Sequence, residues 1–209
     1  MQLFPTLALG FSLGVLHATD PDHVVAVATL VTERRGIRGA LRVGAFWGVG
    51  HALTLLVIGG ALVLLRWVVP PALEAAFELC VAAMLVWLGV RTLRRAAPDD
   101  HPGSTGLRGF MVGALHGLAG SAAVALAVLT QVEGVVEGLG YLVAFGAGTV
   151  LGMMVATGLI GVPLSLRVAN ERLHQMRQRW LRPVAGLASV VVGAVMVGKI
   201  GFVDGLFVP

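Results

Sequence analysis

Long apolar blocks, separated by short polar or basic stretches, make up almost the whole chain of 209 residues. A helix that crosses a bilayer needs about 20 consecutive, mainly apolar residues. Six blocks reach that length, and they predict spans over residues 4–31, 40–65, 72–93, 107–131, 135–163 and 184–203. Only 12% of the residues are charged, whereas soluble domains carry about 25%. We therefore expect an all-α, polytopic membrane protein and not a soluble enzyme.

The basic residues fall almost entirely on one side of this predicted membrane protein. Thirteen of the fifteen lie in or beside the connections that follow the first, third and fifth spans, whereas Arg66 and Lys199 lie on the other side. Cytoplasmic loops are enriched in arginine and lysine. We therefore expect a protein of the inner (plasma) membrane with both termini outside the cytoplasm. Because the net charge of +4 resides in short loops, we expect no nucleic-acid partner.

A short internal repeat divides the chain into two halves. Residues 11–17 match residues 110–116 at an offset of 99, and Phe, Gly, Leu and His are identical at four of the seven positions. The copies open the first and the fourth spans, so residues 1–97 and 98–209 each contain three spans. An odd number of spans inverts the second half relative to the first. We expect one transmembrane domain, residues 1–209, built as two inverted three-helix repeats, as in many secondary transporters.

The first predicted span contains four ionisable residues within seven positions, His17, Asp20, Asp22 and His23. Such side chains are costly inside a bilayer, and those that occur there face the interior of the helix bundle. On an ideal helix His17, Asp20 and His23 share one stripe, and Asp22 points elsewhere. Pro21 removes a helical hydrogen bond at this place and kinks the helix. We expect the break to turn Asp22 inward.

Two further histidines, His51 and His116, lie in the second and fourth predicted spans. Imidazole nitrogen and carboxylate oxygen together suit divalent first-row metals such as Ni²⁺, Co²⁺ and Zn²⁺. The sequence therefore predicts a metal site with the candidate ligands His17, Asp20, Asp22, His23, His51 and His116. A metal-free, buried His–Asp network is the alternative for the first span. For His51 and His116, each taken singly, an interhelical hydrogen bond is an equal alternative.

Two carboxylates, Glu74 and Glu78, stand four residues apart at the start of the third span, on the side with few basic residues. One interpretation is that they concentrate cations at an outer mouth. The other, which the sequence favours, is that they are solvated carboxylates at the membrane interface.

The pattern His17-x4-Asp22-His23 resembles the HX4DH signature of the nickel/cobalt permease family. Residues 50–54 and 117–121 are similar to segments of its six-span bacterial relatives, which include nickel/cobalt exporters and urease-accessory-type transporters. The resemblance implies transport of a metal ion through the membrane. It also implies that the three signature residues are essential.

The same resemblance assigns Asp20 and His51 supporting roles. The chain departs from the classical permeases, which have eight spans, and it lacks the long His-rich loop of some exporters. The direction of transport, uptake or export, therefore stays open.

The leading hypothesis is a secondary transporter that moves Ni²⁺ or Co²⁺, with Zn²⁺ as a further cargo of the same donor chemistry. On this reading the protein is not an enzyme and has no prosthetic group, and its partners are the metal ion and the lipid bilayer. Homo-oligomerisation is left open. The alternative is a membrane-embedded zinc hydrolase, which needs the same ligands and an open position for water. A non-transporting metal sensor, or an assembly partner of a larger complex, ranks third.

Overall fold

The computed structural model describes residues 3–32, 36–94, 104–132, 134–165 and 171–203, and these residues form helices and short connections without a strand. The all-helical fold is thus confirmed for this part of the chain. Eight α-helices occur in it: α1 Leu3–His17, α2 Pro21–Thr32, α3 Gly36–Thr54, α4 Gly60–Leu65, α5 Pro71–Arg94, α6 Ser104–Gln131, α7 Val135–Ser165 and α8 Glu171–Gly198. A π-helical segment, η1 (Leu55–Gly59), joins α3 to α4, and a second, η2 (Lys199–Val203), extends α8.

Four helical stretches of the described residues are long and apolar enough to cross a membrane: Ile37–Leu65, Pro71–Arg94, Val135–Val162 and Trp180–Phe202. They correspond to the second, third, fifth and sixth predicted spans. α6 covers the fourth predicted span but is not among these four. The structure is therefore that of a helical membrane protein, and the count of six spans stays a prediction. The predicted boundary between residues 97 and 98 lies outside the described residues.

The first predicted span is not one helix. α1 ends at His17 and α2 begins at Pro21, so the block of residues 4–31 is divided into helices of 15 and 12 residues. Proline lacks the N–H that would continue α1, whereas it is well suited to the first position of a new helix. The Asp20 carbonyl accepts the first hydrogen bond of α2, from the N–H of Val24 at 3.0 Å.

Four helical elements, α1, α3, α6 and α7, pack closely through glycines. α1 lies against α7, and α3 lies against both α6 and α7. A Cβ atom on Gly14 would overlap the carbonyl oxygen of Phe145, and one on Gly113 would overlap that of Trp47. Small residues allow membrane helices to approach this closely. We call these four elements the core bundle.

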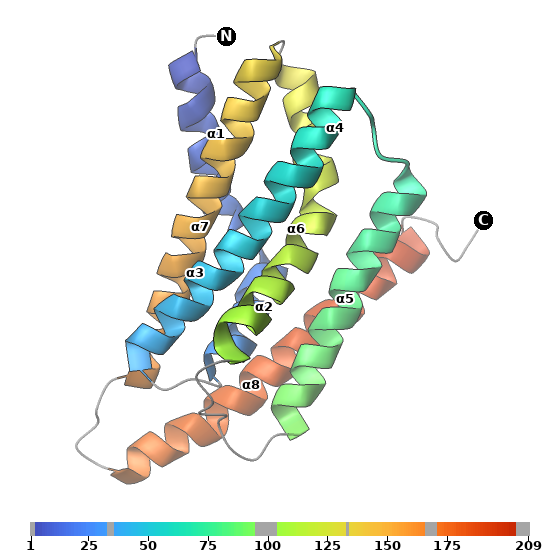
Figure 1. Ribbon diagram of the computed structural model, residues 1–209. Helices are drawn as coiled ribbons and strands as arrows, with labels where there is room; N and C mark the ends of the chain where they lie inside the picture. The colour runs from blue at the N-terminus through green and yellow to red at the C-terminus, as the bar shows by residue number, and fades with distance from the viewer. Residues whose placement is uncertain (1–2, 33–35, 95–103, 133, 166–170, 204–209) are drawn as a thin grey trace.

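α5 and α8 form a separate pair that crosses beside the core bundle (Figure 1). Gly89 and Gly186 meet at their crossing, where the Ser189 hydroxyl donates a hydrogen bond of 2.8 Å to the Leu85 carbonyl. The colour gradient of Figure 1 also shows that α6 runs opposite to α1 and α2. In the α5–α8 pair, α5 belongs to the first predicted half of the chain and α8 to the second, so the pair joins the two halves.

Two buried apolar clusters enclose the middle of the core bundle. One includes Val43 and Trp47 of α3, and the other includes Leu55 of η1 and Phe145 of α7. His51 lies on α3 between Trp47 and Leu55, with no solvent exposure. Along α3, buried apolar packing therefore continues on both sides of His51.

Candidate metal site

The structure brings the predicted ligands together from four elements. His17 ends α1, Asp22 and His23 lie in the first turn of α2, His51 lies on α3 and His116 on α6. The His23 ring is the centre of the group, because its centroid lies 4.5 Å from that of His17, 5.2 Å from that of His51 and 4.7 Å from that of His116. Asp20 belongs to the connection between α1 and α2. We call these six residues the imidazole cluster.

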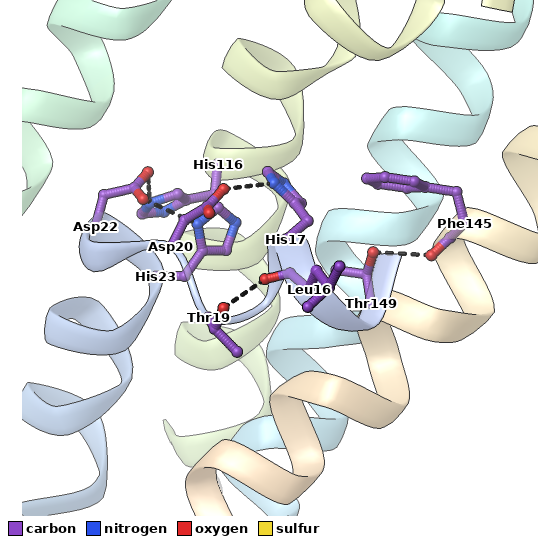
Figure 2. A network of polar contacts seen from close by, with 9 residues as sticks. All are labelled: Leu16, His17, Thr19, Asp20, Asp22, His23, His116, Phe145 and Thr149. Carbon is purple, nitrogen blue, oxygen red and sulfur yellow. Dashed lines mark hydrogen bonds and ion pairs between the residues drawn. The ribbon is translucent and has the colours of Figure 1, made fainter. Parts of the chain in front are cut away.

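The broken helix positions the two carboxylates (Figure 2). Asp20 lies 2.7 Å from Nδ1 of His17 and is about half exposed. Asp22 turns towards the bundle, where its Oδ1 lies 3.1 Å from Nδ1 of His23 and its Oδ2 lies 3.3 Å from Nε2 of His116. The Leu16 carbonyl near the end of α1 accepts hydrogen bonds from both the hydroxyl and the backbone N–H of Thr19, at 2.6 and 2.9 Å, and these bonds tie the connection to α1.

The imidazoles are deeply buried and only partly satisfied. The exposed fractions of His23, His51 and His116 are 3%, 0% and 2%. Neither ring nitrogen of His51 has a hydrogen-bond partner among the described residues, and neither do the Nε2 atoms of His17 and His23. A buried polar group without a partner costs about 1–3 kcal/mol. Several such nitrogens facing one another form a donor set that a bound cation would satisfy.

The donors divide into two overlapping groups. One atom each from His17, His23 and His51 lies within 4.8 Å of the others, and the same holds for Asp22, His23 and His116. Ligands at about 2.1 Å from a metal ion are roughly 3–4 Å apart, so the donor atoms of either group lie close to the spacing that coordination needs. We call them the inner group (His17, His23, His51) and the outer group (Asp22, His23, His116).

A cavity of about 570 Å³ connects the imidazole cluster to the α5–α8 pair. From the cluster it is lined by His17, Asp20, Asp22, His23 and His116, but not by His51. On the other side it is lined by Glu74 and Glu78 of α5 and by Lys199 of η2. All three members of the outer group therefore line the cavity. The inner group includes His51, which does not line it.

Two aromatic residues of the site, Trp47 and Phe145, were missed by the sequence analysis, whereas Gly120 lies in the segment 117–121 that the family resemblance singled out. Trp47 packs against His23 and His116, with ring centroids at 5.4 and 5.7 Å, and Phe145 packs 5.4 Å from His17. Gly120 borders the rings, because a Cβ atom there would lie 3.7 Å from Nε2 of His17. Trp47 precedes His51 by four residues, and helical neighbours at this spacing share a face. That spacing was a usable signal for Trp47, whereas Phe145 had none.

The chain is 35% identical to the urease accessory protein UreH of Bacillus sp. (strain TB-90), over 99% of this chain and 96% of that protein. It is 28% identical to the chloroplast proteins FOR GROWTH AND FERTILITY 1 and 2 of Arabidopsis thaliana, over 73% of this chain. The match spans about half the length of these two, at 48% and 46%. No family model and no solved structure matches the chain.

Proposed function

The chain belongs to the urease-accessory, nickel/cobalt permease-type family, and from this premise we propose that it carries Ni²⁺ across the plasma membrane through the imidazole cluster. The observation that carries the proposal is the convergence of four imidazoles and the Asp22 carboxylate at the broken first helix, with several buried ring nitrogens unpartnered among the described residues. Nitrogen and carboxylate donors suit Ni²⁺, and Co²⁺ and Zn²⁺ are further cargoes of the same chemistry.

The route to the site is the cavity beside the α5–α8 pair. We place its mouth at Glu74 and Glu78, which line it together with Lys199, at the end of the molecule that has few basic residues, which the positive-inside rule places outside the cytoplasm. Carboxylates at a mouth raise the local concentration of cations. Towards the arginine-rich end, buried side chains such as Val27 and Val43 fill the bundle beyond the cluster. This arrangement favours access from one side at a time.

The two donor groups supply successive positions for the ion. The outer group faces the cavity, so it receives the ion first and replaces part of its hydration shell. His23 then remains a ligand while His17 and His51 replace Asp22 and His116. Because His51 has no exposure and does not line the cavity, the inner position is the occluded one. Sharing His23 lets the ion pass without losing all of its protein ligands.

Release on the other side requires the bundle to open there, and packing of the kind expected for the predicted inverted repeat supports such an opening. The contact of Gly14 with Phe145 has its counterpart in that of Gly113 with Trp47, at offsets of 99 and 98 residues. Equivalent contacts of opposite direction are what two inverted repeats produce. The movement that best suits this packing is a rocking of the α5–α8 pair against the core bundle, because the cavity lies between them.

Nickel flux into liposomes tests the proposal. Liposomes that contain the purified protein should accumulate radiolabelled Ni²⁺ along an imposed gradient, whereas protein-free liposomes should not. Equal accumulation in both, with incorporation of the protein verified, would contradict transport. No observation favours the zinc hydrolase, and none of the three relatives above is named as an enzyme.

Replacing both mouth carboxylates, Glu74→Gln with Glu78→Gln, should raise the KM for Ni²⁺ by about 3- to 10-fold at low salt and leave kcat nearly unchanged, since steering acts on encounter. The effect should shrink at high ionic strength. Glu137→Gln is the matched control, because Glu137 lies in the first turn of α7 and does not line the cavity. A fall in kcat without a change in KM would contradict a steering role for these carboxylates.

A further inference from the structure

A second groove lies between α5 and α6, separate from the imidazole cluster, with a volume of about 540 Å³. Its floor is made by buried side chains, Leu30, Met84, Leu88 and Val112. Its walls are made by exposed apolar side chains, Trp87, Leu107, Met111 and Leu115. Trp87, for example, is 56% exposed. In a membrane-embedded protein such a groove faces acyl chains, because its lining is apolar apart from the indole N–H of Trp87 and the two arginines at one end.

Two arginines lie at that end, Arg91 near the end of α5 and Arg108 near the start of α6. The guanidinium of Arg91 lies 5.3 Å above the Trp87 ring, and such stacking holds a cation over an aromatic face. α5 and α6 run in opposite directions (Figure 1). The two charges therefore mark the same end of the groove, at the arginine-rich side of the protein.

We propose that this groove binds one anionic phospholipid of the cytoplasmic leaflet, with its phosphate at Arg91 and Arg108 and an acyl chain along the apolar floor. Arginine binds phosphate oxygens through paired N–H donors. Basic pockets between membrane helices on the cytoplasmic side bind anionic headgroups in this way. From Arg91 back to Ala83 the groove extends about 12 Å along α5, which is most of the roughly 15 Å of one leaflet's hydrocarbon.

A lipid fits this groove better than a second copy of the chain does. A twofold dimer built on the groove would place it against itself. Arg91 and Arg108 would then face their own copies, and like charges that face one another across an interface are unfavourable. An anionic headgroup meets both arginines with the opposite charge. The proposal does not depend on which ion, if any, the imidazole cluster carries.

Trp87 is a reporter inside the groove and makes a direct test feasible. The full-length protein with Trp67→Phe and Trp180→Phe keeps only Trp87 and Trp47, and Trp47 is 1% exposed. This protein is reconstituted in two kinds of vesicle. One contains acyl-brominated phosphatidylglycerol with unbrominated phosphatidylcholine, and the other contains acyl-brominated phosphatidylcholine with unbrominated phosphatidylglycerol. We expect quenching of Trp87 to give about a tenfold higher relative affinity for phosphatidylglycerol, because each arginine near the surface favours an anionic lipid.

The variant Arg91→Gln with Arg108→Gln should lose this preference, whereas Arg66→Gln should keep it, because Arg66 lies at the end of α4 and does not line the groove. Circular dichroism checks that each variant is folded.

Equal quenching by both lipids in the parent protein would overturn the proposal, as would a preference that survives the double substitution. Loss of the preference in the presence of inorganic phosphate would mean that the headgroup charge alone is bound. Protection of Trp87 from both lipids, with a dimeric mass, would mean that a second copy covers the groove. Either result would overturn the lipid assignment.

Discussion

His23→Ala should abolish nickel transport, with a fall in flux of at least about 100-fold. His23 is the member shared by the outer and inner groups, so its loss leaves two donors at each position. Changing even a residue that only orients a metal ligand costs about 10- to 100-fold in affinity, and removal of a shared ligand should cost more. The measurement is the initial rate of radiolabelled Ni²⁺ entry into liposomes at matched protein content, together with the Kd from calorimetry.

Destabilisation must be separated from ligand loss in this experiment, because His23 is 3% exposed. The thermal unfolding midpoint without metal gives the structural cost, and His23→Gln keeps a polar side chain of similar size without the imidazole. Both variants should lose flux even where the midpoint is preserved. His174→Ala is the matched control for removing a histidine, since the sequence places it in the arginine-rich stretch outside the predicted spans. Wild-type flux in a folded His23→Ala protein would end the assignment of this site.

His51→Ala should separate binding from translocation. His51 has no exposure and does not line the cavity, whereas Asp22, His23 and His116 all do. The outer position therefore stays intact in this variant. We expect the equilibrium Kd for Ni²⁺ to stay within about 3-fold of the wild-type value, while flux falls by about 100-fold because the occluded position lacks a ligand.

His116→Ala is the matched comparison, because His116 is as buried as His51 but belongs to the outer group. It should weaken equilibrium binding by at least about 10-fold. Visible absorption of bound Co²⁺ reports the ligand set independently of flux, and it should change for His116→Ala more than for His51→Ala. If both variants lose binding equally, the donors form one site and the two-position route is wrong. If the wild-type protein binds no metal, the proposed function itself fails.

Much of the chemistry could be predicted from the sequence, because it depends on local properties. The length of the apolar blocks predicts helices and a membrane, and the described residues are helical. The chemistry of proline predicts an interruption at Pro21, although the structure separates two helices there where a kink in one was expected. The HX4DH pattern is contiguous, so the family could be named from it, and the 35% identity to UreH confirms that family. The kind of donor is likewise a property of each residue type.

Only the tertiary structure decided how the donors are shared and which of them the cavity reaches. His51 and His116 are distant in sequence from His23, and their rings reach the same site because Gly113 and Gly117 allow α3 and α6 to approach closely. The pairing of α5 with α8 was equally invisible, because it joins helices from opposite halves of the chain. Helix faces follow from local periodicity, but the choice of which faces meet depends on packing across the whole bundle. For that reason the ligands were predictable as a set, whereas their division into an outer and an inner group was not.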